Sequence, residues 1–174
     1  MTARRVVLTG SESTGKSTMA LALARHYGTI ALPEFARQYM DAKGSALDAD
    51  DVEPIVRGQL ASEEMALGSA KRILIQDTDV VSTMVYARHY NGRCPSWIVE
   101  AASIHRASLY LLSDIDVPWV ADPQRDRGHM RAEMHALFVA ALREIGARVV
   151  LIRGEWSARQ GAAIAAIDSL LKRD

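Results

Sequence analysis

An eight-residue stretch near the start of the chain constrains the fold more than any other feature of the sequence. Residues 10–17 read Gly-Ser-Glu-Ser-Thr-Gly-Lys-Ser and match the pattern G-x-x-x-x-G-K-[ST] at every fixed position. The stretch follows an apolar run at residues 5–9 and leads into helix-forming residues that end at Gly28. A strand, a glycine-rich turn and a helix in this order form a loop whose backbone N–H groups surround a phosphate. A glycine-rich turn that binds nothing is the alternative.

The residue types in this loop predict how a nucleoside triphosphate is held. We expect the Lys16 ammonium to reach the β- and γ-phosphates and the Ser17 hydroxyl to ligate Mg²⁺. Glu12 adds a negative charge to the loop, so its side chain should point away from the phosphates or toward the acceptor substrate. The loop residues predicted to bind ATP are Gly10, Ser13, Thr14, Gly15, Lys16, Ser17 and Thr18.

Composition and charge exclude several other kinds of protein. The chain has 174 residues, 49% of them apolar, which is enough to bury a core in a single domain spanning 1–174. Twenty-one basic residues balance 21 acidic ones, which argues against a protein that coats nucleic acid or an anionic membrane. Cys94 is the single cysteine, and no apolar run approaches the length of a membrane helix. We therefore expect a cytoplasmic protein, whose oligomeric state the sequence leaves open.

Short apolar segments alternate with helical segments along the whole chain. Strands are predicted at residues 5–9, 29–32, 72–76, 109–112 and 148–152. Helices are predicted at residues 16–27, 34–43, 50–70, 79–90, 95–107, 130–145 and 157–172. This alternation predicts an α/β fold with a five-stranded, mainly parallel sheet sandwiched between helices. In such folds the ligand binds at the carboxyl ends of the strands.

A phosphate-binding loop does not define the reaction, so other parts of the sequence must narrow it. No N/T-K-x-D motif for reading guanine follows a late strand, which argues against a GTPase. A ring-forming AAA motor normally needs a helical lid domain, for which 174 residues leave no room. The remaining plan is a nucleoside-kinase-like P-loop enzyme that transfers a phosphoryl group from ATP to a small molecule. An ATP-binding regulator without kinase activity is the alternative.

Three carboxylates are candidates for the acceptor side of such a site. Glu34 opens a helix after the second strand and could orient the attacking hydroxyl as a catalytic base, although the helix dipole alone also favours an acid there. Asp77 and Asp79 follow the third strand, where one suits Mg²⁺ and catalysis and the other suits substrate hydroxyls. We assign Asp77 to catalysis, metal and substrate and Asp79 to substrate, while capping of the next helix is the alternative for one of them.

The segment 114–131 has the composition of a lid that closes over phosphates. It has no clear period and contains Arg125 and Arg127, with Arg131 at its end. Guanidinium groups on such a segment would neutralise charge in the transition state and exclude water, so Arg125 and Arg127 are predicted to be catalytic and Arg131 to bind nucleotide. Asp122 in the same segment is a predicted substrate contact. A solvated charged loop is the alternative.

Two tryptophans follow strand ends and could stack on planar rings. Trp119 is placed to stack on the ring of the acceptor, and Trp156 on adenine, although tryptophans are more often found in cores. His129 and His135 are six residues apart and have no histidine or cysteine near them in sequence. A structural zinc site is therefore not expected.

Several of these motifs together resemble one known family. Residues 10–18, the stretch Pro-Glu-Phe-Ala-Arg at 33–37, Asp-Thr-Asp at 77–79 and Leu-Tyr-Leu-Leu-Ser-Asp-Ile-Asp-Val-Pro-Trp at 109–119 occur in this order. The pattern is similar to the ribosylnicotinamide kinase domain of bacterial NAD regulators of the NadR type, which is classed among AAA-like P-loop ATPases. The resemblance continues through residues 122–128 and 152–159, so it covers nearly the whole chain.

This resemblance implies a substrate and a reaction that the residue types alone do not. It implies ATP-dependent phosphorylation of the ribose 5′-hydroxyl of nicotinamide riboside, which gives nicotinamide mononucleotide. Arg37 in the Pro-Glu-Phe-Ala-Arg stretch joins the expected substrate contacts on the same ground. The helix-turn-helix and the adenylyltransferase domain of the full-length regulators have no counterpart here, and no H-x-G-H signature is present. A kinase for another nucleoside or small metabolite is the runner-up.

Overall fold

The computed structural model describes residues 3–118 and 130–172. Its strands are β1 (Arg4–Thr9), β2 (Ala31–Leu32), β3 (Ile73–Asp77), β4 (Leu109–Ser113) and β5 (Val149–Ile152). Its α-helices are α1 (Lys16–Tyr27), α2 (Phe35–Lys43), α3 (Val52–Ser69), α4 (Val80–Asn91), α5 (Ser96–Ile104), α6 (Arg131–Glu144) and α7 (Trp156–Leu171), and a 3₁₀ helix, η1 (Ala49–Asp51), precedes α3. The predicted alternation of strands and helices is confirmed.

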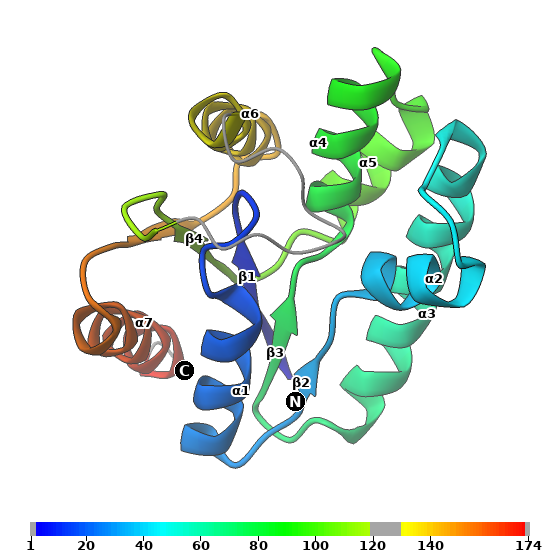
Figure 1. Ribbon diagram of the computed structural model, residues 1–174. Coiled ribbons are helices and arrows are strands. Elements are labelled where there is room, and N and C mark those ends of the chain that lie inside the picture. The colour runs from blue at the N-terminus through cyan, green and yellow to red at the C-terminus, as the bar shows by residue number, and fades with distance from the viewer. Residues whose placement is uncertain (1–2, 119–129, 173–174) are drawn as a thin grey trace.

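The strands form one parallel sheet in the order β2-β3-β1-β4-β5 (Figure 1). β1 lies in the middle, with Leu8 opposite Asp77 of β3 and Thr9 opposite Leu112 of β4. The end of β1, where the glycine motif begins, is therefore flanked by the ends of two neighbouring strands. The expectation of a mainly parallel sheet is confirmed, and every strand pair that the structure describes is parallel.

Two layers of helices bury the two faces of the sheet. Val6 and Leu8 belong to a cluster with residues of α1 and α7, whereas Val7 belongs to a cluster with residues of α3, α4, α5 and α6. Successive side chains of a strand point to opposite faces, so a continuous apolar strand supplies both clusters at once. Figure 1 shows α1 and α7 together on one side of the strands and the other helices across the sheet.

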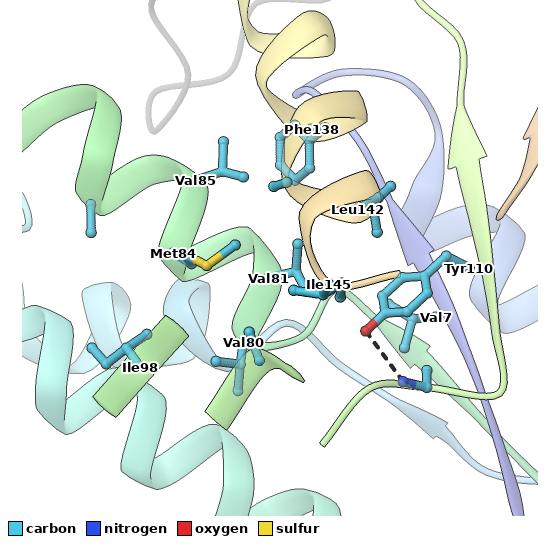
Figure 2. Packing of buried hydrophobic residues seen from close by; sticks show 14 of the residues in the cluster. Val7, Val80, Val81, Met84, Val85, Ile98, Tyr110, Phe138, Leu142 and Ile145 are labelled. Carbon is cyan, nitrogen blue, oxygen red and sulfur yellow. Dashed lines mark hydrogen bonds between the residues drawn. The ribbon is translucent and has the colours of Figure 1, made fainter. Parts of the chain in front are cut away.

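The larger cluster places an aromatic residue with a polar end directly under α4. Figure 2 shows Tyr110 of β4 beside Val7, with Val81 and Leu142 from neighbouring helices close by. The Tyr110 ring is fully buried, and its hydroxyl accepts a hydrogen bond from the backbone N–H of Ala107 at 3.3 Å. A buried phenol requires such polar partners, because leaving the hydroxyl unpaired would cost about 1–3 kcal/mol.

Some predicted elements differ from the structure in extent. The second strand covers only Ala31–Leu32, because the Thr29 N–H still bonds the Ala24 carbonyl at the end of α1, at 2.9 Å. The predicted helix 95–107 ends at Ile104, and the helix predicted to start at residue 50 begins as η1, capped by Asp48. Among the described residues, no helix combines the length and apolar character needed to cross a membrane.

Candidate functional site

The glycine motif forms a tight loop between β1 and α1. Gly10 has a φ of +122°, and a Cβ added to it would lie 3.0 Å from the carbonyl oxygen of Ser113 and 3.3 Å from a methyl carbon of Leu112. Only glycine adopts this conformation readily, and only glycine fits this close to β4. Gly10 is thus required both by the turn and by the approach of the neighbouring strand.

The rest of the loop wraps back on itself before α1 starts. Ser13 and Gly15 have positive φ angles of 54° and 82°. The Ser11 carbonyl accepts hydrogen bonds from the Lys16 Nζ at 2.7 Å and from the Thr14 hydroxyl at 2.9 Å. Gly15 is the N-cap of α1, so the first N–H groups of that helix open toward the loop. The geometry is that of an anion-binding loop, as the motif predicts.

The end of β3 brings the Asp-Thr-Asp stretch beside the loop. Asp77 is opposite Leu8 in β1, and the Thr78 N–H donates to the Leu8 carbonyl at 2.9 Å. Asp77 is 5% exposed, and its Oδ1 has no hydrogen-bond partner among the residues that the structure describes. Thr78, between the two aspartates, has a φ of +66°, which is unfavourable for a β-branched residue.

Asp79 has a different environment from Asp77. It is the N-cap of α4, where its Oδ1 accepts from the Val81 N–H at 3.0 Å and its Oδ2 accepts from the Tyr110 hydroxyl at 2.7 Å. Burial raises the pKa of Asp79 to about 6, and the Tyr110 hydrogen bond limits this rise. Both carboxylate oxygens are engaged by the fold, as the capping alternative describes, and the substrate contact of Asp79 stays a prediction.

A groove of about 850 Å³ lies beside the loop and is lined by three of the seven predicted acceptor residues. Glu12, Glu34 and Arg37 all line it, together with Lys16. Glu34 is the N-cap residue of α2, and its side chain makes no capping hydrogen bond. The groove wall continues along α2 and the loop after it, through Met40, Asp41, Leu47 and Asp48. The predicted acceptor contacts at positions 12, 34 and 37 are therefore brought together.

The opposite wall of the groove is formed by α4 and contains residues that the sequence analysis missed. Ser82, Thr83, Tyr86 and Tyr90 line it on successive turns. The rings of Tyr86 and Tyr90 are stacked, with centroids 5.8 Å apart and planes 6° from parallel. Their spacing of four residues on a predicted helix places them on one face, and this signal could have revealed the pair in advance.

A second, smaller hollow of about 210 Å³ lies over the glycine loop itself. It is lined by residues 13–18 and by Arg37. Lys16 and Arg37 line both the hollow and the groove, so the two spaces meet at these two cations. This arrangement suits a reaction in which an anionic group passes from a molecule in one space to a molecule in the other.

Residues from the C-terminal part of the chain cover the outer side of the loop. Trp156 is 43% exposed, and its ring lies 3.8 Å from the position of a Cβ on Gly15. Arg131 donates to the carbonyl of Val117 at 2.8 Å and to that of Ser13 at 3.5 Å. The structure thus places Trp156 and Arg131 beside the predicted nucleotide site.

Two further groups of predictions have different outcomes. Trp119, Asp122, Arg125 and Arg127 lie outside the described residues, so their predicted roles stay predictions. Within residues 3–118 and 130–172, no three histidine, cysteine, aspartate or glutamate side chains gather in a way that could hold a metal ion.

Arg159 is a further residue that the sequence analysis did not single out. It is 3% exposed and donates to the Thr14 carbonyl of the loop at 3.4 Å. A cation in the first turn of a helix is disfavoured by the helix dipole, and this is the signal that could have drawn attention to it.

Comparison with known proteins places this site in a family. A family model described as an AAA domain matches residues 5–159, a range that contains the glycine loop, both sides of the groove and Arg159. The chain belongs to this AAA-domain family. It is also 30% identical over 158 residues to the trifunctional NAD biosynthesis/regulator protein NadR of Escherichia coli strain K12, and 31% identical over 147 residues to the NadR protein of Salmonella typhimurium strain LT2.

The chain is shorter than these relatives. The aligned parts cover 87% and 81% of this chain but only 38% and 36% of the two NadR proteins. Similarity to the NadR type, expected from the motifs, is confirmed for that part of the relatives.

Solved structures agree with this placement. A crystal structure of NadR in complex with NR has a TM-score of 0.84 and 25% identity, and covers 97% of this chain and 51% of that one. A NadR complex with NAD and AMP-PNP has a TM-score of 0.83 and 26% identity, with 98% and 50% coverage. Thymidylate kinase from Ehrlichia chaffeensis, at 15% identity and a TM-score of 0.71, shares the fold. The predicted nucleoside-kinase-like P-loop fold is confirmed.

Proposed function

We propose that this chain is a kinase that transfers the γ-phosphoryl group of ATP to the 5′-hydroxyl of nicotinamide riboside and so forms nicotinamide mononucleotide. The observation that carries the proposal is the meeting of the loop hollow and the groove at Lys16 and Arg37. A phosphoryl group must travel only from one space to the other, past two cations. Similarity to NadR proteins, one of them solved with NR and another with NAD and AMP-PNP, supports this choice of acceptor and donor.

The residues at the meeting point have separate tasks in this proposal. Lys16 binds the β- and γ-phosphates and stays with the transferred group as its charge spreads in the transition state. Arg37 contacts the same group from the acceptor side and neutralises charge there. Glu34, at the start of α2, accepts the hydrogen bond of the 5′-hydroxyl and directs its oxygen toward the phosphorus.

The residues around Asp77 fit a magnesium ion that accompanies ATP. A buried carboxylate oxygen without a partner in the described structure is costly, and a hydrated cation is the kind of group that would satisfy it. Ser17, at the loop hollow, would supply the hydroxyl ligand, and Asp77 would hold the ion through water. When bound, Mg²⁺ neutralises the β- and γ-phosphate oxygens.

The α4 wall of the groove is suited to the ring of the acceptor. Nicotinamide riboside carries a planar, positively charged ring, and the stacked Tyr86 and Tyr90 offer aromatic surface at the groove. Four carboxylates line the same groove, at Glu12, Glu34, Asp41 and Asp48, against the two cations where it meets the hollow, and this excess of negative charge favours a cationic ligand. Trp119 remains a predicted second ring contact, as Trp156 is for adenine on the donor side.

A panel of acceptors tests the proposal directly. The protein is incubated with ATP, Mg²⁺ and one candidate at a time, among them nicotinamide riboside, nicotinic acid riboside, thymidine and other nucleosides, and the product is identified by mass. We expect nicotinamide riboside to give the largest kcat/KM and a product heavier by one phosphate. Preference for thymidine or another nucleoside would replace the acceptor, and ATP hydrolysis that no acceptor accelerates would favour the regulatory ATPase instead.

A further inference from the structure

The buried Arg159 connects parts of the chain that are far apart in sequence. Its Nε donates to the Gly154 carbonyl at 2.8 Å, and one terminal nitrogen donates to the Asp114 carbonyl at 3.2 Å. The same nitrogen forms an ion pair with Asp116, and the other donates to the Thr14 carbonyl at 3.4 Å. One guanidinium thus contacts the phosphate loop, the end of β4 and the turn before α7.

Asp116 is itself held in place for this pairing. Its second oxygen accepts the Gly154 N–H at 2.6 Å, so the carboxylate bridges the turn and the guanidinium. Burial raises the pKa of Asp116, but the Gly154 hydrogen bond and the Arg159 charge outweigh it and hold this pKa below its usual range. Arg159 therefore has a charged partner and two backbone acceptors that fix its orientation independently of the loop.

The contact with Thr14 has a geometric consequence for the loop. In a trans peptide the C=O and the N–H of one unit point in opposite directions. A Thr14 carbonyl turned toward Arg159 therefore turns the Gly15 N–H to the opposite side, toward the hollow that the loop encloses. Arg131 contacts the Ser13 carbonyl in the same way, which orients the Thr14 N–H.

This part of the loop needs outside support. Ser13 and Gly15 both have positive φ angles, and a serine in that conformation is strained by about 1 kcal/mol or more. The strained backbone persists only where its surroundings hold it. Arg159 is placed to supply this support from the side of the loop away from the groove.

We propose that Arg159, oriented by Asp116, is a positioning residue for the phosphate donor: it turns the Thr14–Gly15 peptide so that its N–H faces the phosphates. It acts through the loop backbone. The proposal rests on the proposed function only in taking a triphosphate as the donor, and it does not depend on the acceptor.

Binding of inorganic tripolyphosphate with Mg²⁺ tests this role without an acceptor and without adenine. We expect Arg159→Met to weaken tripolyphosphate and ATP by a similar factor of about 10, because one set of charge-assisted contacts to the loop is lost. The KM for ATP should rise with it, while the KM for the acceptor changes little. Trp156→Ala should weaken ATP and leave tripolyphosphate unchanged, which separates the adenine contact from the loop.

Arg153 supplies a matched control on the same turn. It is 71% exposed and lies 3.8 Å from Asp114, so Arg153→Met removes one positive charge from this region without touching the loop. We expect its tripolyphosphate affinity to stay within about twofold of the wild type, since exposed ion pairs contribute little. An equal loss in both variants would mean that general positive charge, rather than Arg159, accounts for the effect.

A purely structural role for Arg159 has its own signature. If Arg159→Met lowers the melting temperature but the folded protein binds tripolyphosphate as the wild type does, the proposal is wrong. If Arg159→Met does not fold, Asp116→Asn keeps the guanidinium and removes its charged partner. We then expect a smaller loss of tripolyphosphate affinity, about threefold, and recovery of wild-type affinity in Asp116→Glu; unchanged affinity in Asp116→Asn would overturn the proposal.

Discussion

The two halves of the site are attached to the molecule in different ways. The phosphate loop is anchored in the sheet, with Gly10 against β4 and the buried Arg159 against its outer side. The other half is the groove wall formed by α2, which carries Arg37 and has Glu34 as its N-cap residue, and is called the acceptor wall below; this helix has no buried residue. Phe35 packs against Gly58 of α3, and Lys43 pairs with Asp48 and Asp51 at the other end of the helix.

In the proposed function, this difference follows from what each half of the site must bind. The phosphate loop binds a group whose shape and charge are the same in every nucleoside triphosphate, so a fixed backbone suffices. The acceptor wall must admit a substrate and then contact it, and a helix attached at a few points can do so at low cost. We therefore expect mutations of the loop to abolish catalysis or folding. Mutations at the attachments of α2 should change only the KM for the acceptor.

The largest effect should come from the lysine shared by the two spaces. Lys16→Ala removes one of the two cations that line both the hollow and the groove, and we expect kcat to fall by about 10²–10³-fold or more. Steady-state kinetics with saturating ATP and nicotinamide riboside measure this. Lys71→Ala, at an exposed position in the bend before β3, is the matched control and should leave kcat unchanged. Retained turnover in Lys16→Ala would place the chemistry elsewhere.

A smaller but still severe effect is expected at the anchored glycine. Gly10→Ala introduces a Cβ 3.0 Å from the Ser113 carbonyl oxygen at a φ of +122°, and should lower the free energy of unfolding by about 2–4 kcal/mol. Gly28→Ala has a positive φ of 61° but no atom within 4 Å of the new Cβ, so it should cost only about 1 kcal/mol. Urea denaturation of both variants measures the difference, and equal losses would mean that the contact with β4 adds nothing.

The attachment of α2 should affect the acceptor more than the fold. A Cβ at Gly58 would lie 2.0 Å from the Phe35 ring, so Gly58→Ala must displace that ring and loosen α2. We expect the KM for nicotinamide riboside to rise about tenfold while the KM for ATP stays unchanged. Gly68→Ala, in the same helix with open space around it, should instead stabilise the protein by up to about 1 kcal/mol and leave both KM values unchanged. A parallel rise in the KM for ATP would contradict the separation of the two halves.

The same contrast explains which parts of the molecule could be predicted from the sequence. The phosphate loop and the succession of strands and helices along the chain depend on local rules: apolar runs, glycine caps and a fixed motif. Gly28, Gly44 and Gly92 all follow helices in the left-handed conformation that their position predicts. These rules act over a few neighbouring residues, so these features can be predicted from the sequence without knowledge of the structure.

The missed features depend on contacts between distant residues. Arg159 and Thr14 are 145 positions apart, and the sequence around each residue does not predict that they are in contact. Asp79 rather than Asp77 caps α4, and the Thr78 between them has a positive φ, a conformation that a threonine does not suggest. The Tyr86–Tyr90 pair could be placed on one helix face, but its position in the groove follows only from the packing of α4 against the sheet.

The smallest effect should come from the ion pairs at the end of α2, and its pH dependence is defined. The Lys43 hydrogen bonds, at 2.5 Å to Asp51 and 2.9 Å to Asp48, hold the pKa of both carboxyls below the usual range and raise the pKa of Lys43 to about 12. Because the carboxyl pKa values are depressed, the ion pairs contribute fully above the ordinary aspartate pKa, near 4, and are lost as the pH falls through the lower, folded-state values. Because the lysine pKa is raised, the ion pairs are lost on the alkaline side only near pH 12.

Lys43→Met should therefore speed hydrogen exchange of the α2 amides a few-fold relative to those of α1. This factor should stay the same from pH 5 to 8, and the difference from the wild type should shrink toward pH 3. Arg57→Met removes a surface pair with Glu53 on α3 and should leave exchange in α2 unchanged. An exchange difference that changes between pH 5 and 8 would show that a group other than this cluster attaches α2.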